Sequence, residues 1–296
     1  MAVTPEQMVD TINARMGKHP HHRALHAKGT VVRGTFTGTA EAAELTRAAQ
    51  FSGAPTPVTA RVSNGNGNPN LPDYHQDVRG LAVAFQLDGS RPVISAQSLP
   101  LFAVRSPDEF QALIIALAPG PSQAWRLPRF LIRNPHAAAS LPTNGKALKP
   151  PRSYATLPYY AIHAYKWIAT DGSSRFVRYH WIPEAGDQRL SAKEAKAGGR
   201  DYLRTEFAER IAAGPVRFTL RVQIAEDGDV TRDPSSRWPA SRRVIDGGTL
   251  ELTEVIPEEG ILVFDPTAIT DGIELSDDVV LQFRAGAYTE SVNRRV

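Results

Sequence analysis

Polar and apolar residues alternate in short runs along much of the chain, a pattern typical of strands whose two faces meet different surroundings. Gly, Pro and Asn residues separate these runs, as expected at turns between strands. Two of the runs flank Asp171-Gly172, a dipeptide that favours the tight turn of a β-hairpin. The pattern predicts strands within residues 29–39, 57–63, 80–89, 91–97, 160–183, 216–227 and 248–256.

Other segments repeat their apolar residues at helical spacing and begin at residues that cap helices. Ser106 precedes one such segment and Ser276 precedes another, so we expect both to be N-caps. Residues 119–153 are rich in Pro, Arg and Asn, and we expect a connection or an irregular helical segment there. The spacing predicts helices within residues 4–17, 40–51, 106–118, 191–214 and 276–295.

Many short strands with appended helices are typical of an α+β fold built on a β-barrel or sandwich with helical insertions. A chain of 296 residues can bury a sizeable core as one large domain or two smaller ones. No internal repeat or low-complexity tract divides the sequence, and residues 119–153 do not have the character of a domain linker. We therefore predict a single domain over residues 1–296.

Composition excludes several classes of function. The net charge is only +3, and no cluster of Lys and Arg with interleaved aromatic residues points to nucleic acid. The absence of cysteine excludes thiolate catalysis, iron–sulfur clusters and disulfides. The N-terminal segment lacks the apolar core of an export signal, and no apolar run is long enough to cross a bilayer. We expect a cytoplasmic protein with no membrane partner, or a periplasmic one if a leader was removed.

The last predicted helix contains a pair of residues with possible metal chemistry. Arg284 and Tyr288 are four residues apart, so in a helix they lie one turn apart on the same face. A guanidinium beside a phenol favours the phenolate, and a tyrosinate can be an axial ligand of haem iron. A basic C-terminal tail is also commonly just solvated, so both interpretations stay open on spacing alone.

Two further groups carry candidate chemistry. In RALHAKG, Arg23 precedes His26 by three residues, although a lone histidine in such a context is more often a packed or surface side chain. The segment ARVSNGNGNPN contains Arg61 and Ser63 before an Asn/Gly-rich stretch, which would ordinarily be a mobile loop.

Together, these groups resemble the haem catalases, and in particular the short catalase-related peroxidases. The similar motifs cover almost the whole chain in the family's order: RALHAKG, ARVS, DVRGLAVAF, LPLFAVRSPDEF, RYHWIP and DVVLQFRAGAY. The resemblance implies the catalase core fold, an antiparallel β-barrel with helical insertions and a C-terminal proximal helix. It also implies haem b as the cofactor, and it gives no basis for expecting NADPH.

The resemblance assigns roles to individual residues. On the distal side of the haem, His26 would be the catalytic base, Ser63 would orient it, and Gln97 would be the distal amide. On the proximal side, Tyr288 would be the iron ligand and Arg284 would stabilise its phenolate. The other implied positions are three propionate-binding arginines, an aromatic residue over the haem, and two residues that support Arg284, namely Arg23, Arg61, Arg295, Phe110, Asp278 and His180.

One departure from the family bears on activity. Catalases carry an asparagine where this chain has Gln97, or Ser98 if the register shifts by one residue. The extra methylene displaces the amide by roughly one C–C bond length, and a misplacement of about 1 Å can cost on the order of a hundredfold in rate. We therefore expect weak catalase activity and a peroxidase that reduces organic hydroperoxides and hydrogen peroxide with a small electron donor.

Three alternatives remain at this stage. The protein could be a true small catalase, a fatty-acid hydroperoxide isomerase of the same fold, or a haem-binding protein without turnover. The expected partners are a peroxide substrate and a small-molecule donor, with a homo-oligomer possible.

Overall fold

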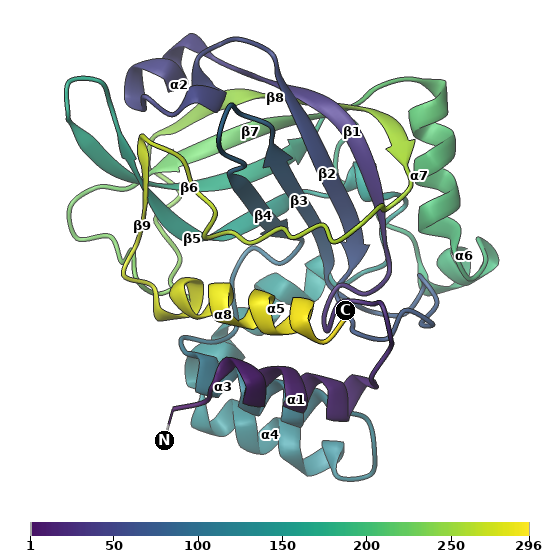
Figure 1. The fold of residues 1–296 in the computed structure, drawn as a ribbon. Coiled ribbons are helices and arrows are strands. Elements are labelled where there is room, and N and C mark those ends of the chain that lie inside the picture. Colours follow the sequence, from purple (N-terminus) through teal and green to yellow (C-terminus); the bar gives the residue numbers. More distant parts are fainter. Residues whose placement is uncertain (1, 296) are drawn as a thin grey trace.

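The computed structural model describes residues 2–295, and Figure 1 shows a strand-rich body above a layer of helices. The strands are β1 (Gly29–Gly38), β2 (Thr56–Asn64), β3 (Arg79–Phe85), β4 (Val93–Gln97), β5 (Tyr159–Ile168), β6 (Ser174–Pro183), β7 (Val216–Ile224), β8 (Val244–Ile256) and β9 (Ile273–Leu275). The helices are α1 (Pro5–Met16), α2 (Ala40–Leu45), α3 (Pro107–Leu117), α4 (Gln123–Arg133), α5 (Pro135–Ala147), α6 (Ala192–Ala197), α7 (Tyr202–Ala213) and α8 (Val279–Asn293), with short 3₁₀ turns at Ala49–Phe51 and Tyr154–Thr156.

The strands form one antiparallel sheet with the order β4-β3-β2-β1-β8-β7-β6-β5-β9. A further antiparallel pairing between β4 and β5, through Gln97 and Tyr160, closes the sheet into a barrel to which β9 is appended. The prediction of an antiparallel barrel with helical insertions and a C-terminal helix is therefore confirmed. Closure removes the exposed edges that an open sheet would present.

The barrel interior is filled by the inward-facing residues of the strands. Phe36 packs edge-to-face against Phe85 and Trp181, with ring centroids 5.2 and 5.9 Å apart, and all three side chains are fully buried. Because side chains alternate along a strand, the residues between these core positions face outward. The interior is thus a packed core, and polar side chains for chemistry must lie on the outer wall.

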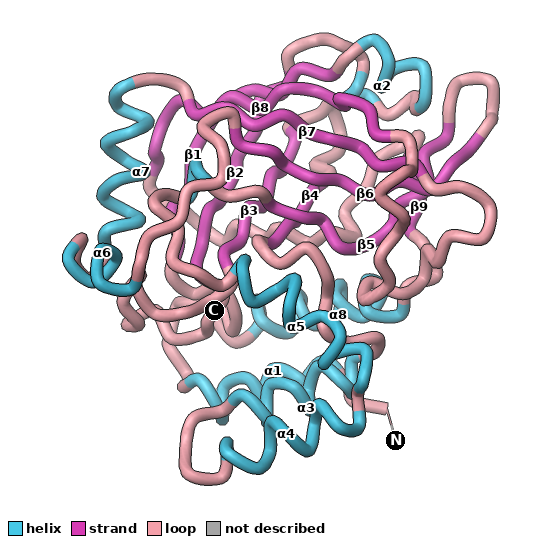
Figure 2. The backbone as a smooth tube through the Cα atoms, turned by 180° about the vertical axis from the view of Figure 1, so that it is seen from behind, coloured by secondary structure: helices cyan, strands magenta, loops and turns pink. Residues whose placement is uncertain are grey.

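Helix α8 lies between the barrel and helices α1, α3 and α4. In both Figure 1 and Figure 2, α8 is next to the barrel, α1 and α3 are beyond it, and α4 is outermost. Most side chains of α8 from Phe283 to Val292 are only half-buried, although the helix lies between two layers. Accessible space therefore adjoins this helix.

One expectation about local structure was wrong, and a second was only partly right. The N-cap of α8 is Asp278, whose Oδ1 accepts the backbone N–H of Val280 at 2.8 Å, whereas Ser276 lies before the cap. Residues 119–153 contain the regular helices α4 and α5 although each has an internal proline, Pro128 and Pro142. Pro128 lies on the exposed face of α4, where water can bond the backbone carbonyl that the proline leaves without a donor.

No helix within residues 2–295 is both long enough and apolar enough to cross a membrane.

Candidate functional site

A row of small and polar residues crosses the outer wall of the barrel. Ser63 on β2 pairs with Gly29 on β1 and with Gly80 on β3, and Gly80 pairs in turn with Gln97 on β4. Directly opposite residues in an antiparallel sheet share one face, so these positions lie side by side. Ser95, two residues from Gln97 on the same face, has its hydroxyl 3.4 Å from an Arg284 guanidinium nitrogen, so this wall faces α8.

His26 is held against this row by a constrained backbone. Its φ of 56° lies in the left-handed region, which non-glycine residues rarely adopt. The His26 N–H donates to the carbonyl of Gly65 at 2.9 Å, and Arg61 Nη1 donates to the His26 carbonyl at 2.8 Å. Several contacts thus fix a conformation that is unfavourable by itself, a situation often found at functional sites.

The His26 imidazole lies between Ser63 and Gly80. Its Nδ1 is 2.9 Å from Ser63 Oγ, and a Cβ at Gly80 would come within 2.9 Å of Nδ1, Cε1 and that hydroxyl. Any other residue at position 80 would therefore displace the His26 ring or the Ser63 hydroxyl. The expected proximity of His26 and Ser63 is therefore present in the structure.

The surroundings of His26 favour its neutral form. Burial, and then the positive charges of Arg61 and Arg284, lower the pKa of His26 from 6.5 to about 3. With Nδ1 engaged by Ser63, Nε2 can carry the lone pair of the neutral ring. A neutral imidazole at physiological pH can accept a proton.

Facing this wall, a chain of hydrogen bonds runs along and beneath α8. Arg284 Nη2 donates to the Tyr288 phenol oxygen at 2.7 Å, and Arg284 Nη1 lies 3.3 Å from His163 Nε2. His163 Nδ1 lies 2.6 Å from Asp278 Oδ2, while Asp278 Oδ1 caps the helix. Asp278 and His163 are almost fully buried, so the chain has a rigid end.

The hydrogen bonds define the protonation of this chain. Nδ1 of His163 donates to the Asp278 carboxylate, so Nε2 accepts from Arg284. Burial lowers the pKa of His163 and outweighs the opposing effect of Asp278, which leaves the ring neutral. Burial alone would lower the pKa of Arg284, but interactions with Tyr288 raise it overall. Arg284 therefore stays positively charged beside the phenol.

The sequence predicted that His180 supports Arg284, and this prediction was wrong. His180, on β6, packs its ring edge-to-face against Tyr160 with centroids 5.1 Å apart, and His163 on β5 occupies the position beside Arg284. His163 was missed because it lies within an apolar strand and resembles a packed core residue. A buried histidine needs a polar partner, and this requirement could have pointed to His163. Its partner is Asp278.

A cluster of arginines lies at one end of the site. Arg23 and Arg61 both bind the carboxylate of Glu258, with Arg61 Nε at 3.2 Å from Oε2. Burial and the charge of Arg23 lower the pKa of Arg61 to about 10. The same two causes lower the pKa of Arg295. Burial would raise the pKa of Glu258, but Arg61 and Arg23 lower it overall, so Glu258 is ionised. Sequence reasoning missed Glu258, which lies 197 residues from Arg61.

Comparison with known proteins identifies the family of the chain. Residues 4–296 match the family model described as Catalase. The chain belongs to the catalase family. A catalase-related peroxidase from Mycolicibacterium paratuberculosis is 46% identical over 99% of this chain and 95% of its own length. Another from Synechococcus elongatus is 35% identical over 99% of this chain and 89% of its own length.

Solved structures support the fold. A fungal catalase superimposes with a TM-score of 0.85 at 24% identity, covering 98% of this chain and 62% of the other. Catalase A from Saccharomyces cerevisiae also gives 0.85, at 23% identity, covering 98% of this chain and 64% of the other. These likenesses show the catalase fold, and this chain spans about three fifths of each structure.

Catalase-family proteins are generally haem-dependent, and the charges of the site fit that cofactor. The guanidinium groups of Arg23, Arg61 and Arg295 meet one carboxylate, that of Glu258, which leaves two positive charges in excess. Arg295 Nε is buried and has no hydrogen-bond partner among the described residues. Two propionates would supply the missing negative charge and acceptors.

Gln97, which the sequence suggested as the distal amide, also carries a buried polar group without a partner among the residues that the structure describes. The Nε2 of Gln97 is buried without a partner among residues 2–295. Ser98 is engaged elsewhere, because its hydroxyl accepts the Arg79 N–H at 3.0 Å and only 1% of the residue is exposed. Gln97 shares the face of Gly80 and Ser63, so the structure favours Gln97 over Ser98 as the residue that faces the site.

Phe110, on α3, packs against an apolar cluster that neighbours of His26 and Arg284 also contact. It packs in a cluster with Leu25, the neighbour of His26, and with Phe283, the neighbour of Arg284. Its ring centroid is 5.6 Å from that of Phe102. Its stacking over a haem remains a prediction.

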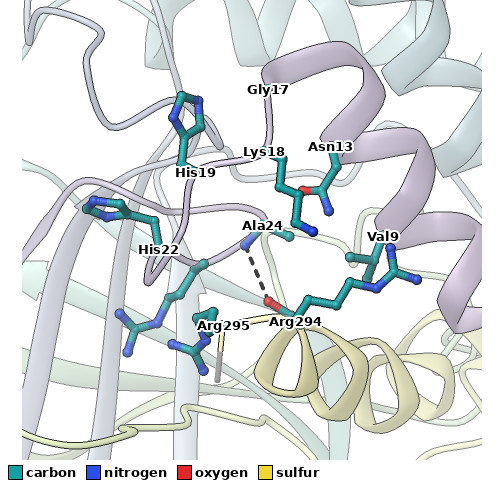
Figure 3. A pocket seen from close by; sticks show the side chains of 11 residues that line it. Val9, Asn13, Gly17, Lys18, His19, His22, Ala24, Arg294 and Arg295 are labelled. Atoms are coloured by element: carbon teal, nitrogen blue, oxygen red, sulfur yellow. Dashed lines mark hydrogen bonds between the residues drawn. The ribbon is translucent and has the colours of Figure 1, made fainter.

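A basic pocket adjoins the arginine cluster where α8 ends. Figure 3 shows its lining, which includes Lys18, Arg23, Arg294 and Arg295 and, among the described residues, no aspartate or glutamate. Within this lining, the Ala24 N–H donates to Ser291 Oγ at 3.3 Å. The pocket shares Arg23 and Arg295 with the cluster, so an anion bound there would lie beside the proposed propionate site.

Proposed function

We propose that the protein is a haem b peroxidase that reduces organic hydroperoxides and hydrogen peroxide with a small electron donor. The observation that carries this proposal is the placement of a neutral, serine-bonded His26 on the barrel wall opposite a phenol, Tyr288, that is bonded by Arg284. A protein that only bound haem would not need a positioned base.

The family assignment supports the general class of enzyme. Two relatives that match nearly the full chain are catalase-related peroxidases, which makes an oxidoreductase acting on peroxide the natural reading of this site. When bound, haem would supply the redox centre at which the peroxide O–O bond is cleaved. Tyr288 would hold its iron, and Arg23, Arg61 and Arg295 would bind its propionates.

The chain's own residues would perform the proton transfers. His26 would take the proton from the peroxide oxygen and return it to the departing oxygen, a general-base step followed by a general-acid step. Ser63 would keep the imidazole in one orientation through the contact at Nδ1. On the other wall, the positive charge of Arg284 would face the tyrosinate when Tyr288 binds iron, and an anionic ligand would stabilise oxidised iron.

Gln97 is the reason for proposing a peroxidase rather than a catalase. Its amide extends one methylene further than the asparagine of catalases, so it cannot occupy the same position. The second half of dismutation requires another hydrogen peroxide to be oriented at this place. The first half requires mainly His26, and should be less affected.

The basic pocket of Figure 3 favours an anionic donor. Arg23 is already paired with Glu258, and Arg294 with Asp10 and Glu290. Lys18 and Arg295 form no ion pair among residues 2–295, so their charges would attract negatively charged reductants, such as carboxylates or sulfonates, to the edge of the site. A donor bound there would be close to the groups that hold the propionates, and electron transfer would not require it to reach His26.

The test is a measurement of oxygen release and donor oxidation by the haem-loaded protein, both normalised to haem content. A peroxidase oxidises a phenolic donor in proportion to the peroxide consumed and releases little oxygen. Rapid oxygen release would favour a compact catalase. Conversion of a fatty-acid hydroperoxide without any donor would favour an isomerase, and no turnover of any peroxide would favour a haem-binding protein.

A further inference from the structure

The outer face of α4 exposes large apolar side chains. Trp125 is 60% exposed and Ile132 is 82% exposed, and they are separated by two helical turns on one face. The opposite side of α4 is ordinary core, because Phe130 is buried in a cluster with Val104 and Ala137. The exposed residues are therefore not needed to pack the helix against the molecule.

Unpaired positive charges share this face. Arg129 and Arg133 are four and eight residues after Trp125, so they lie beside the two apolar side chains. Both are exposed, and neither forms an ion pair with any residue in the described part of the chain. The face thus combines a tryptophan and an isoleucine with free guanidinium groups.

The surrounding sequence is also free of acids. No aspartate or glutamate occurs from residue 110 to residue 170, although the whole chain contains 31 of them. That segment carries seven cations, which are Arg126, Arg129, Arg133, Lys146, Lys149, Arg152 and Lys166. The positive potential at α4 is therefore not offset by acids of its own segment.

Helix α4 is the element farthest from the barrel in both Figure 1 and Figure 2, and no described element lies beyond it. A flat surface can consequently approach it without contact with the barrel. A basic helix face with tryptophan and aliphatic residues is the composition of helices that lie in the interface of an anionic bilayer.

We propose that the outer face of α4 docks on anionic phospholipid surfaces. Trp125 and Ile132 would enter the boundary between headgroups and acyl chains, and Arg129 and Arg133 would bind lipid phosphates. A second copy of the chain is a poorer partner, because a two-fold pairing of this face would bring the arginines of both copies together. This proposal departs from the expectation, made from the sequence, that the protein has no membrane partner.

Sedimentation with vesicles tests the proposal on the full chain. We expect binding to vesicles of phosphatidylcholine mixed with phosphatidylglycerol, weakened by high salt, and no binding to phosphatidylcholine alone. Binding should also shift tryptophan emission to shorter wavelength. Trp125 would report it, since Trp167, Trp181 and Trp238 are buried.

Matched variants separate docking from general charge effects. Arg129→Gln with Arg133→Gln should weaken vesicle binding about thirtyfold, since each arginine contributes about 1 kcal/mol near an anionic surface. Trp125→Ser with Ile132→Ser should abolish it. The control, Lys193→Gln with Arg204→Gln, removes two exposed charges near α6 and α7, and its binding should stay within about twofold of wild type.

Three outcomes would overturn the proposal. They are no binding of the wild-type protein to anionic vesicles, equal loss in the arginine pair and in the control, and a change from dimer to monomer in the Trp125→Ser, Ile132→Ser variant. The last outcome, measured by sedimentation velocity without lipid, would make this face a subunit interface. Unchanged circular dichroism would show that the variants are folded.

Discussion

The two walls of the site hold their side chains in different ways. On the barrel wall, His26 is neutral, sits in a left-handed backbone conformation and contacts Ser63 through one ring nitrogen. On the helix wall, Tyr288 is at the end of a continuous chain of hydrogen bonds that begins at a buried helix cap. Among residues 2–295, the second ring nitrogen of His26 has no partner, whereas every side chain in the series from Asp278 to Tyr288 is hydrogen-bonded.

The difference corresponds to two chemical tasks. A group that transfers protons must change its charge easily, and neutral His26 can do so because little else depends on its free nitrogen. A group that holds a charge must not change, and Arg284 is fixed between His163 and Tyr288 for that reason. A change confined to one wall should therefore leave the task of the other wall intact.

The largest effect should follow His26→Gln. Removal of a general base should lower the rate of peroxide reduction by about 10²–10⁴-fold, while haem affinity stays the same because the helix wall is intact. Stopped-flow kinetics and a haem titration measure the two quantities. His75→Gln, at an exposed histidine outside the site, is the control. A rate close to wild type in His26→Gln would contradict the assignment of the base.

The next effect concerns the helix wall. His163→Leu removes the neutral donor from one oxygen of the buried Asp278 carboxylate, which should cost about 3 kcal/mol of unfolding free energy because the acceptor left unpaired is charged. His180→Leu removes a histidine that makes an aromatic contact instead, and should cost about 1–2 kcal/mol. Urea unfolding of both variants makes the comparison. Equal costs, or a larger cost for His180→Leu, would mean that the chain beneath Arg284 is not the main support.

A smaller effect is expected from a single methyl group on the barrel wall. Gly80→Ala places a Cβ 2.9 Å from the His26 ring, which must then move, and the rate should fall by about a hundredfold. Gly145→Ala on α5 has open space around the new methyl and should stabilise the fold by up to about 1 kcal/mol. If Gly80→Ala retained full activity, the position of His26 would not be critical.

The smallest effect is a dependence on pH. The pKa of His26 is about 3 in the folded protein and 6.5 in the unfolded chain, so between these values only the unfolded chain binds the proton. Stability should therefore decline as pH falls below about 6.5, while the rate stays flat down to about pH 5. Urea unfolding of wild type and His26→Gln should show a shallower decline in the variant. An inflection of the rate near pH 6.5 would contradict a buried neutral base.

The sequence predicted best those parts of the site that are local. Arg284 and Tyr288 belong to one helix, so their spacing alone predicted a contact that the structure contains. Asp278 was expected behind Arg284 and does lie there, through His163. Contacts between distant segments could not be predicted from spacing. Whether His163 or His180 meets Arg284, for example, depends on how β5 packs against α8.

Charge and helix propensity explain the other failures. Glu258 has no local feature that distinguishes it from a surface glutamate, and only the fold brings it between Arg23 and Arg61. Helices α4 and α5 were expected to be irregular because of their prolines, but packing around Phe130 overrides that preference in α4. Helix propensity is a poor guide where tertiary contacts determine the local structure.

The central claim is that Tyr288, held by Arg284, is the side chain that would bind haem iron. It is tested most directly by titrating haem into the apoprotein of wild type, Tyr288→Phe and the control Tyr74→Phe, followed by absorption spectroscopy. We predict that Tyr288→Phe binds haem at least about tenfold more weakly, a loss of about 1.4 kcal/mol or more, with a changed spectrum, while Tyr74→Phe matches wild type. Unchanged affinity and spectrum in Tyr288→Phe would contradict the account.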